Sequence, residues 1–172
     1  MSYKTNDFTF RIGVGGGGLK LGNTRKQIEH FLQDNGEKGS VFHDAYFIRY
    51  KKLGIQINYN PIGDKARAIF LYHKTDWCQY YDYDGFQGAT LEGIDWNSTP
   101  TDVLKAYGKP FKDFRGHSKL NERYSRRMLY DGMSFFFWDT DMVRMSLGWE
   151  TEEQKAEYDE IPEICPHGKP PL

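Results

Sequence analysis

The sequence has few cysteines and almost no net charge, which argues against a disulfide-rich protein, a cysteine metal site and a strongly basic binding protein. Its 172 residues include only two cysteines, Cys78 and Cys165, which fit neither a disulfide framework nor a CxxC metal site. The net charge is −1, which argues against a strongly basic nucleic-acid footprint and against a polybasic membrane anchor. We therefore expect no nucleic-acid partner and no membrane partner.

Long apolar runs are also missing. No stretch approaches the roughly 20 apolar residues that span a bilayer, and residues 1–10 lack the apolar run of a secretory signal. We therefore expect a cytoplasmic protein. Aromatic residues make up 16% of the chain against 38% for all hydrophobic residues, so rings supply much of the apolar volume of a folded core.

Two segments share the pattern of a short helix. Thr24 with Gln27 forms a capping box, and Thr99 begins a similar start signal with Pro100 at the first helical position and an acid in the first turn. A glycine follows each segment, as expected for a helix end. Apolar residues at i, i+3 and i+4 align between the segments: Ile28 with Val103, Phe31 with Ala106, and Leu32 with Tyr107.

Three predicted strands follow each predicted helix. Residues after Gly54 and Gly132 alternate with the period of half-buried strands. The aligned residues are Ile55, Ile57 and Tyr59 with Met133, Phe135 and Phe137, then Ala66, Ala68 and Phe70 with Val143, Met145 and Leu147, and Arg67 with Arg144. The sequence therefore predicts two helix-strand-strand-strand units of about 55 residues that pair their sheets, since neither buries enough surface alone.

These patterns predict an α+β fold of two similar α-β-β-β units with antiparallel sheets, joined or packed into one domain. Residues 8–14 alternate as an edge or closing strand, and the tail is acidic and then proline-rich. The expected division is residues 1–18 as a strand and glycine-rich loop, 19–73 as the first unit, 74–89 as an aromatic and acidic connector, 90–149 as the second unit and 150–172 as the tail.

Fragments of ligand-binding motifs lack the context that their chemistry needs. Gly13, Gly15 and Gly18 match G-x-G-x-x-G, but no helix opens there and no parallel strand follows. The aspartate pairs at 82 and 84 and at 139 and 141 resemble calcium loops without the bidentate glutamate, and turn chemistry explains them. We expect no cofactor and no metal ion.

No catalytic constellation is convincing, so we expect no enzyme. Acidic neighbours would raise the pKa of the Cys78 thiol and make it a poor nucleophile. The alternative to a binding protein is a small-ligand-binding protein or hydrolytic enzyme with a cleft between the units, using His73, Cys78 or His117. A purely structural oligomer is a third class.

Two groups of residues are typical of contact surfaces. Tyrosine and tryptophan dominate interface hot spots, and the connector contains Trp77, Tyr80, Tyr81 and Tyr83 among acidic residues. The alternative is that these rings bridge the two units as core while the acids face outward. The largest basic cluster contains Arg123, Arg126 and Arg127 with Lys112, Arg115 and Lys119. It suits either an anion or acidic partner, or a solvated strand face and loop. In the run 135–138, consecutive rings point to opposite faces, so Trp138 joins the expected partner-binding residues.

The two helix entries resemble the tandem helix-plus-sheet units of the BamE and beta-lactamase-inhibitory-protein type. The residues that carry the resemblance are 21–28, 98–103 and the helix-ending Gly108-Lys109-Pro110, and it covers about residues 19–149. It implies a scaffold that binds protein and has no catalytic residues. Similar cytoplasmic repeat domains include bacterial toxin-immunity proteins. We expect a non-enzymatic intracellular protein-binding module, such as an immunity or inhibitor protein.

Overall fold

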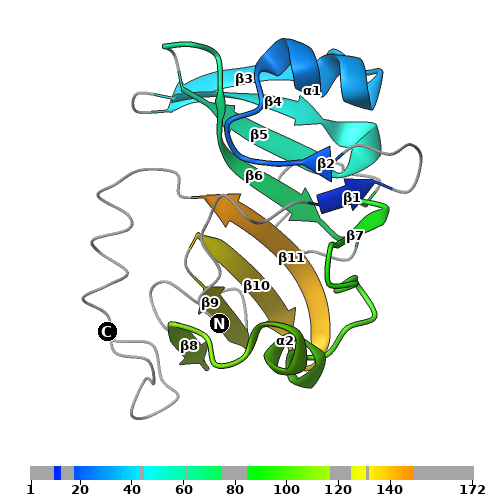
Figure 1. The fold of residues 1–172 in the computed structure, drawn as a ribbon, viewed down its shortest axis with the longest axis vertical. Coiled ribbons are helices and arrows are strands. Elements are labelled where there is room, and N and C mark those ends of the chain that lie inside the picture. The colour runs from blue at the N-terminus through cyan, green and yellow to red at the C-terminus, as the bar shows by residue number, and fades with distance from the viewer. Residues whose placement is uncertain are drawn as a thin grey trace.

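The computed structural model describes residues 10–12, 18–42, 45–60, 62–74, 85–116, 125–130 and 132–148. In these residues, eight strands form one antiparallel sheet and two helices pack on one of its faces (Figure 1). The predicted α+β class is confirmed. The predicted connector and tail lie outside the described residues, except for the ends of the connector.

Each helix is followed along the chain by four strands. Helix α1 (Arg25–Leu32) precedes β3 (Glu37–Phe42), β4 (Ala45–Tyr50), β5 (Ile55–Tyr59) and β6 (Ala66–Tyr72), with a short 3-10 turn at Lys51–Leu53. Helix α2 (Pro100–Tyr107) precedes β8 (Lys112–Arg115), β9 (Arg126–Tyr130), β10 (Met133–Trp138) and β11 (Asp141–Gly148). The prediction of three strands after each helix omitted β3 and β8.

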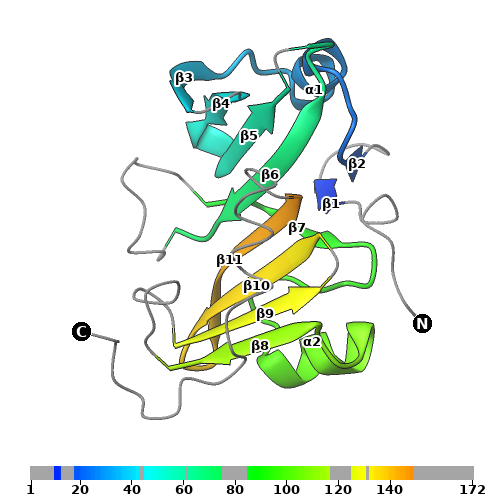
Figure 2. The same cartoon turned by 90° about the vertical axis from the view of Figure 1, so that its left-hand side faces the viewer.

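The strand order in the large sheet is β3-β4-β5-β6-β11-β10-β9-β8. Each group of four strands therefore runs in chain order, and the two groups meet where β6 pairs with β11. At this junction Leu71 lies opposite Met145, and Ala68 lies opposite Gly148. Figure 2 shows the sheet twisting from β3 to β8, which are the outermost of its described strands.

A second, smaller sheet contains the strands that lead into the two helices. Its strands are β1 (Phe10–Ile12), β2 (Gly18–Leu19) and β7 (Gly88–Thr90), in the order β2-β1-β7. The expected edge or closing strand is thus the centre of a separate sheet, because β1 pairs with strands on both sides. Strand β2 leads into α1 and β7 leads toward α2, so β1 ties the two helix entries together.

The helix entries use side-chain hydrogen bonds as predicted. The Gln27 N–H donates to Thr24 Oγ1 at 3.3 Å, and the Thr24 N–H donates to Gln27 Oε1 at 2.8 Å. Thr99 and Asp102 form the same reciprocal pair in α2, at 3.4 and 2.8 Å. These bonds satisfy amides that have no partner inside a helix.

Helix α2 ends at Gly108 as predicted, whereas α1 ends earlier than Gly36, with Gln33 in the left-handed conformation.

The turns before the two helices also match. The Lys20 N–H donates to Asn23 Oδ1 at 3.1 Å, and the Asp95 N–H donates to Ser98 Oγ at 3.0 Å. Both turns therefore end in a polar side chain directly before the threonine that caps the helix. One residue before each turn, Leu19 and Ile94 are buried in the core.

One hydrophobic core lies between the helices and the sheet. It includes Ile28 of α1 and Val103 and Tyr107 of α2, together with residues of β4, β5, β6, β9, β10 and β11. Because the two helices share this core, the described residues form a single packed unit rather than two separate domains.

Strand register corrects the predicted alignment of the two last strands. Ile55 lies opposite Leu71, and Met133 lies opposite Leu147. Register then shifts between residues 58 and 59 in one half and between residues 136 and 137 in the other. As a result, Ala66 corresponds to Met142 rather than Val143, and Ala68, not Arg67, corresponds to Arg144. The prediction was wrong by one residue because alternation alone does not count a bulge.

Candidate functional site

Positive charge is concentrated in one stretch of the chain. Residues 103–130 contain eight lysines and arginines and two acidic residues, a net charge of +6, so the rest of the chain has a net charge of −7. The described part of this stretch is residues 103–116 and 125–130, which include the end of α2 after Asp102, all of β8 and all of β9. These elements lie together at one end of the large sheet (Figure 2). Such asymmetry gives that end of the molecule a positive electrostatic potential.

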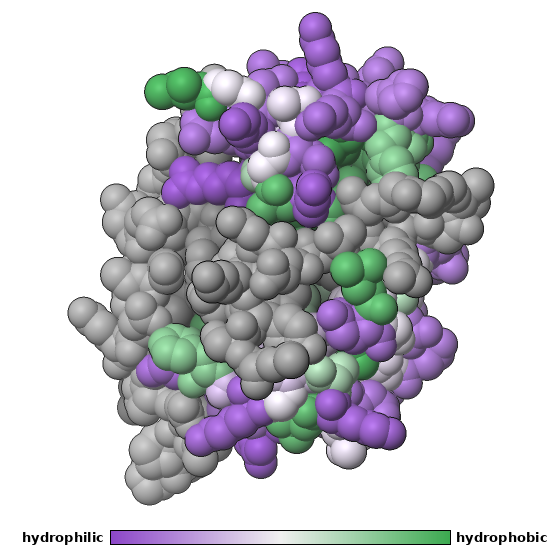
Figure 3. Space-filling model, viewed as in Figure 1, coloured by the Kyte–Doolittle hydropathy of each residue, from purple (hydrophilic) through white to green (hydrophobic). Residues whose placement is uncertain are grey.

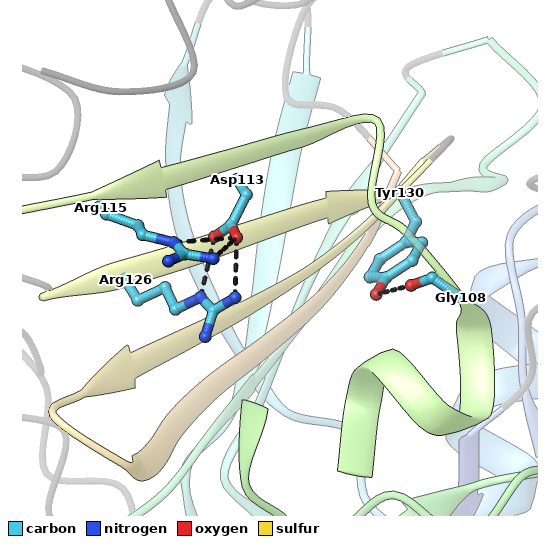
Figure 4. Close-up of polar contacts among 5 residues, drawn as sticks. All are labelled: Gly108, Asp113, Arg115, Arg126 and Tyr130. Carbon is cyan, nitrogen blue, oxygen red and sulfur yellow. Dashed lines mark hydrogen bonds and ion pairs between the residues drawn. The ribbon is translucent and has the colours of Figure 1, made fainter. Parts of the chain in front are cut away.

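Asp113 binds two of the arginines in this region. Arg126 donates from Nε to Asp113 Oδ1 at 2.8 Å and from Nη2 to Oδ2 at 2.7 Å. Arg115 donates to the same Oδ2 from Nε at 3.1 Å and from Nη2 at 2.8 Å. Figure 4 shows both guanidinium groups converging on the one carboxylate. Two cations on one anion leave a net positive charge at this edge of the sheet.

The arginines control the ionisation of Asp113. Partial burial alone would raise the pKa of its carboxyl group, but the hydrogen bonds from Arg126 and Arg115 outweigh that effect and hold the pKa below its usual value. Asp113 is therefore ionised at neutral pH, and it acts as the bridge between β8 and β9.

Arg127 lies on the opposite face of the sheet from Arg126, because successive side chains of a strand alternate. Its guanidinium carbon lies 4.6 Å from the centre of the Phe136 ring, and that of Arg144 lies 4.0 Å from the same ring. Both distances fit cation–π contacts. Arg127 is only 6% exposed and Phe136 only 2%, so this pair belongs to the interior of the protein.

These residues are part of a row across five strands. Successive cross-strand partners alternate between aromatic residues and arginines, in the order Phe114, Arg127, Phe136, Arg144 and Tyr72. Sequence reasoning missed the row, although one signal was available. An Asp-Gly pair separates Tyr130 from Met133, and a two-residue turn there sets Arg127 opposite Phe136.

Among the described strands, β8 lies at one edge of the large sheet, and two large apolar side chains near it in the sequence are exposed. Phe111, directly before β8, is 54% exposed, and Leu104 on α2 is also exposed. The Tyr130 hydroxyl donates to the Gly108 carbonyl at 2.9 Å, which fixes the end of α2 against β9 (Figure 4). Sequence reasoning did not select Phe111 or Leu104, because single apolar residues in a loop or on a helix carry no pattern.

The remaining exposed hydrophobic residues are scattered. On the face seen in Figure 3, hydrophobic residues with described placement appear as separate spots among hydrophilic ones. Among the described side chains, Ile62, Leu91 and Trp138 are the other large exposed ones. Ile62 follows β5 in the first half of the chain, and Trp138 ends β10. Isolated residues of this kind are normal on protein surfaces.

Three of the predicted partner-binding residues lie in the described structure, and they do not form one surface. Arg126 binds Asp113 on the helix-covered face, and Arg127 is buried on the other face. Trp138 ends β10 one residue beyond Phe137, the cross-strand partner of Arg126, so alternation places Trp138 on the face opposite to Arg126. Of the predicted basic cluster, Arg126 and Arg115 therefore lie together at Asp113, whereas Arg127 lies on the opposite face. The others, Trp77, Tyr80, Tyr81, Tyr83 and Arg123, lie outside the described residues.

The residues of the enzymatic alternative are only partly described. His73 contacts the Trp96 ring edge-on at 5.2 Å between ring centres, whereas Cys78 and His117 lie outside the described residues. Within the described ranges, histidine, cysteine, aspartate and glutamate side chains form no group of three or more that would hold a metal ion. The described helices include none with the length and hydropathy of a membrane span.

Comparison with known proteins gives this chain no relatives from which a site might be transferred. No protein-family model, no curated protein and no solved structure matches it.

Proposed function

We propose that this protein is a non-enzymatic, intracellular protein-binding module whose binding surface is the basic region of α2, β8 and β9. The observation that carries the proposal is the collection of positive charge beside exposed apolar side chains. Lys105, Lys109 and Arg115 are exposed in this region, and Leu104 and Phe111, close to them in the sequence, are exposed as well. Interfaces combine apolar anchors with a charged rim in this way.

The expected partner is an acidic protein. The net charge of +6 over residues 103–130 favours an anion, while the net charge of −7 elsewhere repels the long polyanionic backbone of a nucleic acid. A compact acidic patch on a protein can contact the basic region alone, and it need not extend over the acidic remainder of the chain. An inhibitor or immunity protein that covers its target would use such a surface, and the BamE and beta-lactamase-inhibitory-protein type of scaffold is consistent with it.

We also infer that the chain consists of two similar units built around α1 and α2. Matching helix entries, matching strand order and the equivalent register shifts support this inference. A further match is the bond from Tyr72 N–H to the Gly54 carbonyl at 2.9 Å and that from Gly148 N–H to the Gly132 carbonyl at 2.7 Å. The positive charge lies in the second unit, so the two units have different surfaces and divide the binding function unequally.

Site-specific photo-crosslinking tests the proposed surface. A photoreactive phenylalanine analogue placed at Phe111 in the native host is expected to give a discrete protein adduct, identified by mass spectrometry. The same analogue at Ile62, which is 86% exposed, is the matched control and is expected to give none. Identical adducts at both positions, or none at Phe111, would contradict the proposal.

A further inference from the structure

We infer that β8 is a docking strand, and that an extended acidic segment of the partner pairs with its outer edge as a ninth strand of the large sheet. This inference rests on the proposed function, and it specifies how the partner is bound. Among the described strands, β8 has a neighbour only on the β9 side. Addition of a strand to such an edge gives affinity through main-chain hydrogen bonds, and side chains next to the edge give specificity.

The backbone of β8 presents a regular set of outward groups. The Gly116 N–H donates to the Ser125 carbonyl at 2.9 Å, in register with the β8–β9 pairing. Because bonded and non-bonded positions alternate in an antiparallel pair, Lys112 and Phe114 direct their N–H and C=O groups toward β9. Asp113 and Arg115 therefore direct theirs outward, which provides two donors and two acceptors for an added strand.

The other edge of the sheet is less suited to strand addition. Strand β3 pairs with β4 in a register that shifts between Lys38 and Val41. An irregularity of this kind disrupts the row of backbone groups and is a common protection of sheet edges. The pairing of β8 with β9 has no shift over its four residue pairs. The regular edge is therefore also the edge that lies in the basic region.

Charge selects an acidic partner over a second copy of this chain. Lys112 and Arg115 lie on β8, Lys109 lies three residues before it, and the charge of Asp113 is already matched by two arginines. Two copies paired edge to edge would place these cations beside one another, which is unfavourable. Glutamate or aspartate on an added strand would instead meet cations, and Phe111, directly before β8, provides an exposed apolar contact.

The first test uses the whole protein and a synthetic peptide of alternating glutamate and valine, eight residues long. Hydrogen exchange followed by NMR is expected to show slower exchange of the Asp113 and Arg115 amides at saturating peptide. The Lys112 and Phe114 amides, already bonded to β9, should change little. The matching lysine–valine peptide is the charge control and should not bind. Binding of the acidic peptide with unchanged exchange at Asp113 and Arg115 would overturn the inference.

The second test separates the backbone of β8 from its side chains. Arg115→Ala removes the guanidinium group and keeps the amide, whereas Arg115→Pro also removes one outward N–H without removing a bond to β9. Arg115→Pro is expected to bind the acidic peptide about tenfold more weakly than Arg115→Ala, the effect of about one hydrogen bond. Circular dichroism establishes that both variants fold. If Arg115→Pro does not fold, the exchange experiment on the unmodified protein decides the question.

The outcomes distinguish this inference from the proposed function. A partner that crosslinks at Phe111 and binds Arg115→Pro and Arg115→Ala equally would leave the binding surface in place and reject strand addition. The absence of any partner at Phe111 would reject the function itself. Light scattering of the pure protein should give a monomer, and a dimer that Arg115→Pro dissociates would assign the edge to a second copy and overturn the acidic-partner inference.

Discussion

Arg126 holds Asp113 through two hydrogen bonds that cross from β9 to β8, at 2.8 and 2.7 Å. Arg115 binds the same carboxylate from its own strand, but its side chain is 60% exposed, against 18% for that of Arg126. The two arginines therefore contribute differently. The less exposed pair stabilises the β8–β9 pairing, while Arg115 mainly adds charge at the surface.

We predict that Arg126→Ala destabilises the protein more than Arg115→Ala does. Loss of Arg126 removes two charge-assisted bonds from a partly buried carboxylate and should lower the free energy of unfolding by about 2 kcal/mol. Loss of Arg115 should cost only about 0.5 kcal/mol, as is typical of exposed ion pairs. Urea unfolding at neutral pH measures both. Equal losses would show that the two arginines share the carboxylate evenly.

The stability of the β8–β9 pairing should depend on pH in the acid range. The pKa of Asp113 is lower in the folded protein than in the unfolded chain, so the unfolded state binds more protons. The stabilisation is complete above about pH 4, the ordinary range of an aspartate, and is lost as the pH falls through the folded value. We predict that Asp113→Asn has a shallower loss of stability below about pH 4 than the unmodified protein. If the free energy of unfolding fell equally with decreasing pH in the two proteins, this role of Asp113 would be contradicted.

The sequence was sufficient to predict the helices, because their signals are local. Capping at Thr24 and Thr99 and the apolar spacing after each threonine lie within one or two turns. Strands β3 and β8 were missed because their sequences, Glu-Lys-Gly-Ser-Val-Phe and Lys-Asp-Phe-Arg, are short and largely polar. Pairing with a neighbour, rather than local propensity, makes these segments strands.

The candidate site was less predictable than the fold. Asp113 and Arg126 are 13 residues apart, and their contact depends on the pairing of β8 with β9. The basic cluster was visible in the sequence, but alternation sends Arg126 and Arg127 to opposite faces, so adjacency along the chain did not mean adjacency in space. The sequence therefore shows where charge is concentrated along the chain. The strand register must also be known before one can say which face of the sheet carries that charge.

A pair of buried tyrosines should make the protein sensitive to alkali. The hydroxyl groups of Tyr50 and Tyr59 lie 3.3 Å apart, and burial raises the pKa of Tyr50 to about 12 and the pKa of Tyr59 further. In the unfolded chain both ionise near pH 10. Above that pH the unfolded state loses protons that the folded state retains, so stability falls as the pH rises.

We predict that the double variant Tyr50→Phe, Tyr59→Phe loses less stability between about pH 10 and pH 12 than the unmodified protein. At neutral pH each single variant should cost about 1 kcal/mol, because the remaining hydroxyl is buried without this bond, and the double variant should cost less than the sum. Absorbance titration of tyrosinate and urea unfolding measure the two effects. Additive costs at neutral pH would show that the hydroxyls do not interact.

The junction between β6 and β11 should be intolerant of a side chain at Gly148. This residue has a φ of +76°, and a Cβ atom there would lie 2.1 Å from the Arg67 carbonyl oxygen of β6. Gly93 has a similar φ of +83°, but a Cβ atom there would meet nothing within 4 Å, so Gly93→Ala isolates the backbone cost, roughly 1–2 kcal/mol. We predict that Gly148→Ala costs at least about 2 kcal/mol more than Gly93→Ala, because β6 and β11 must also separate. Thermal or urea unfolding of the two variants measures the difference. Equal costs would mean that β6 moves away freely, which is incompatible with a junction that joins two sets of four strands over one shared core.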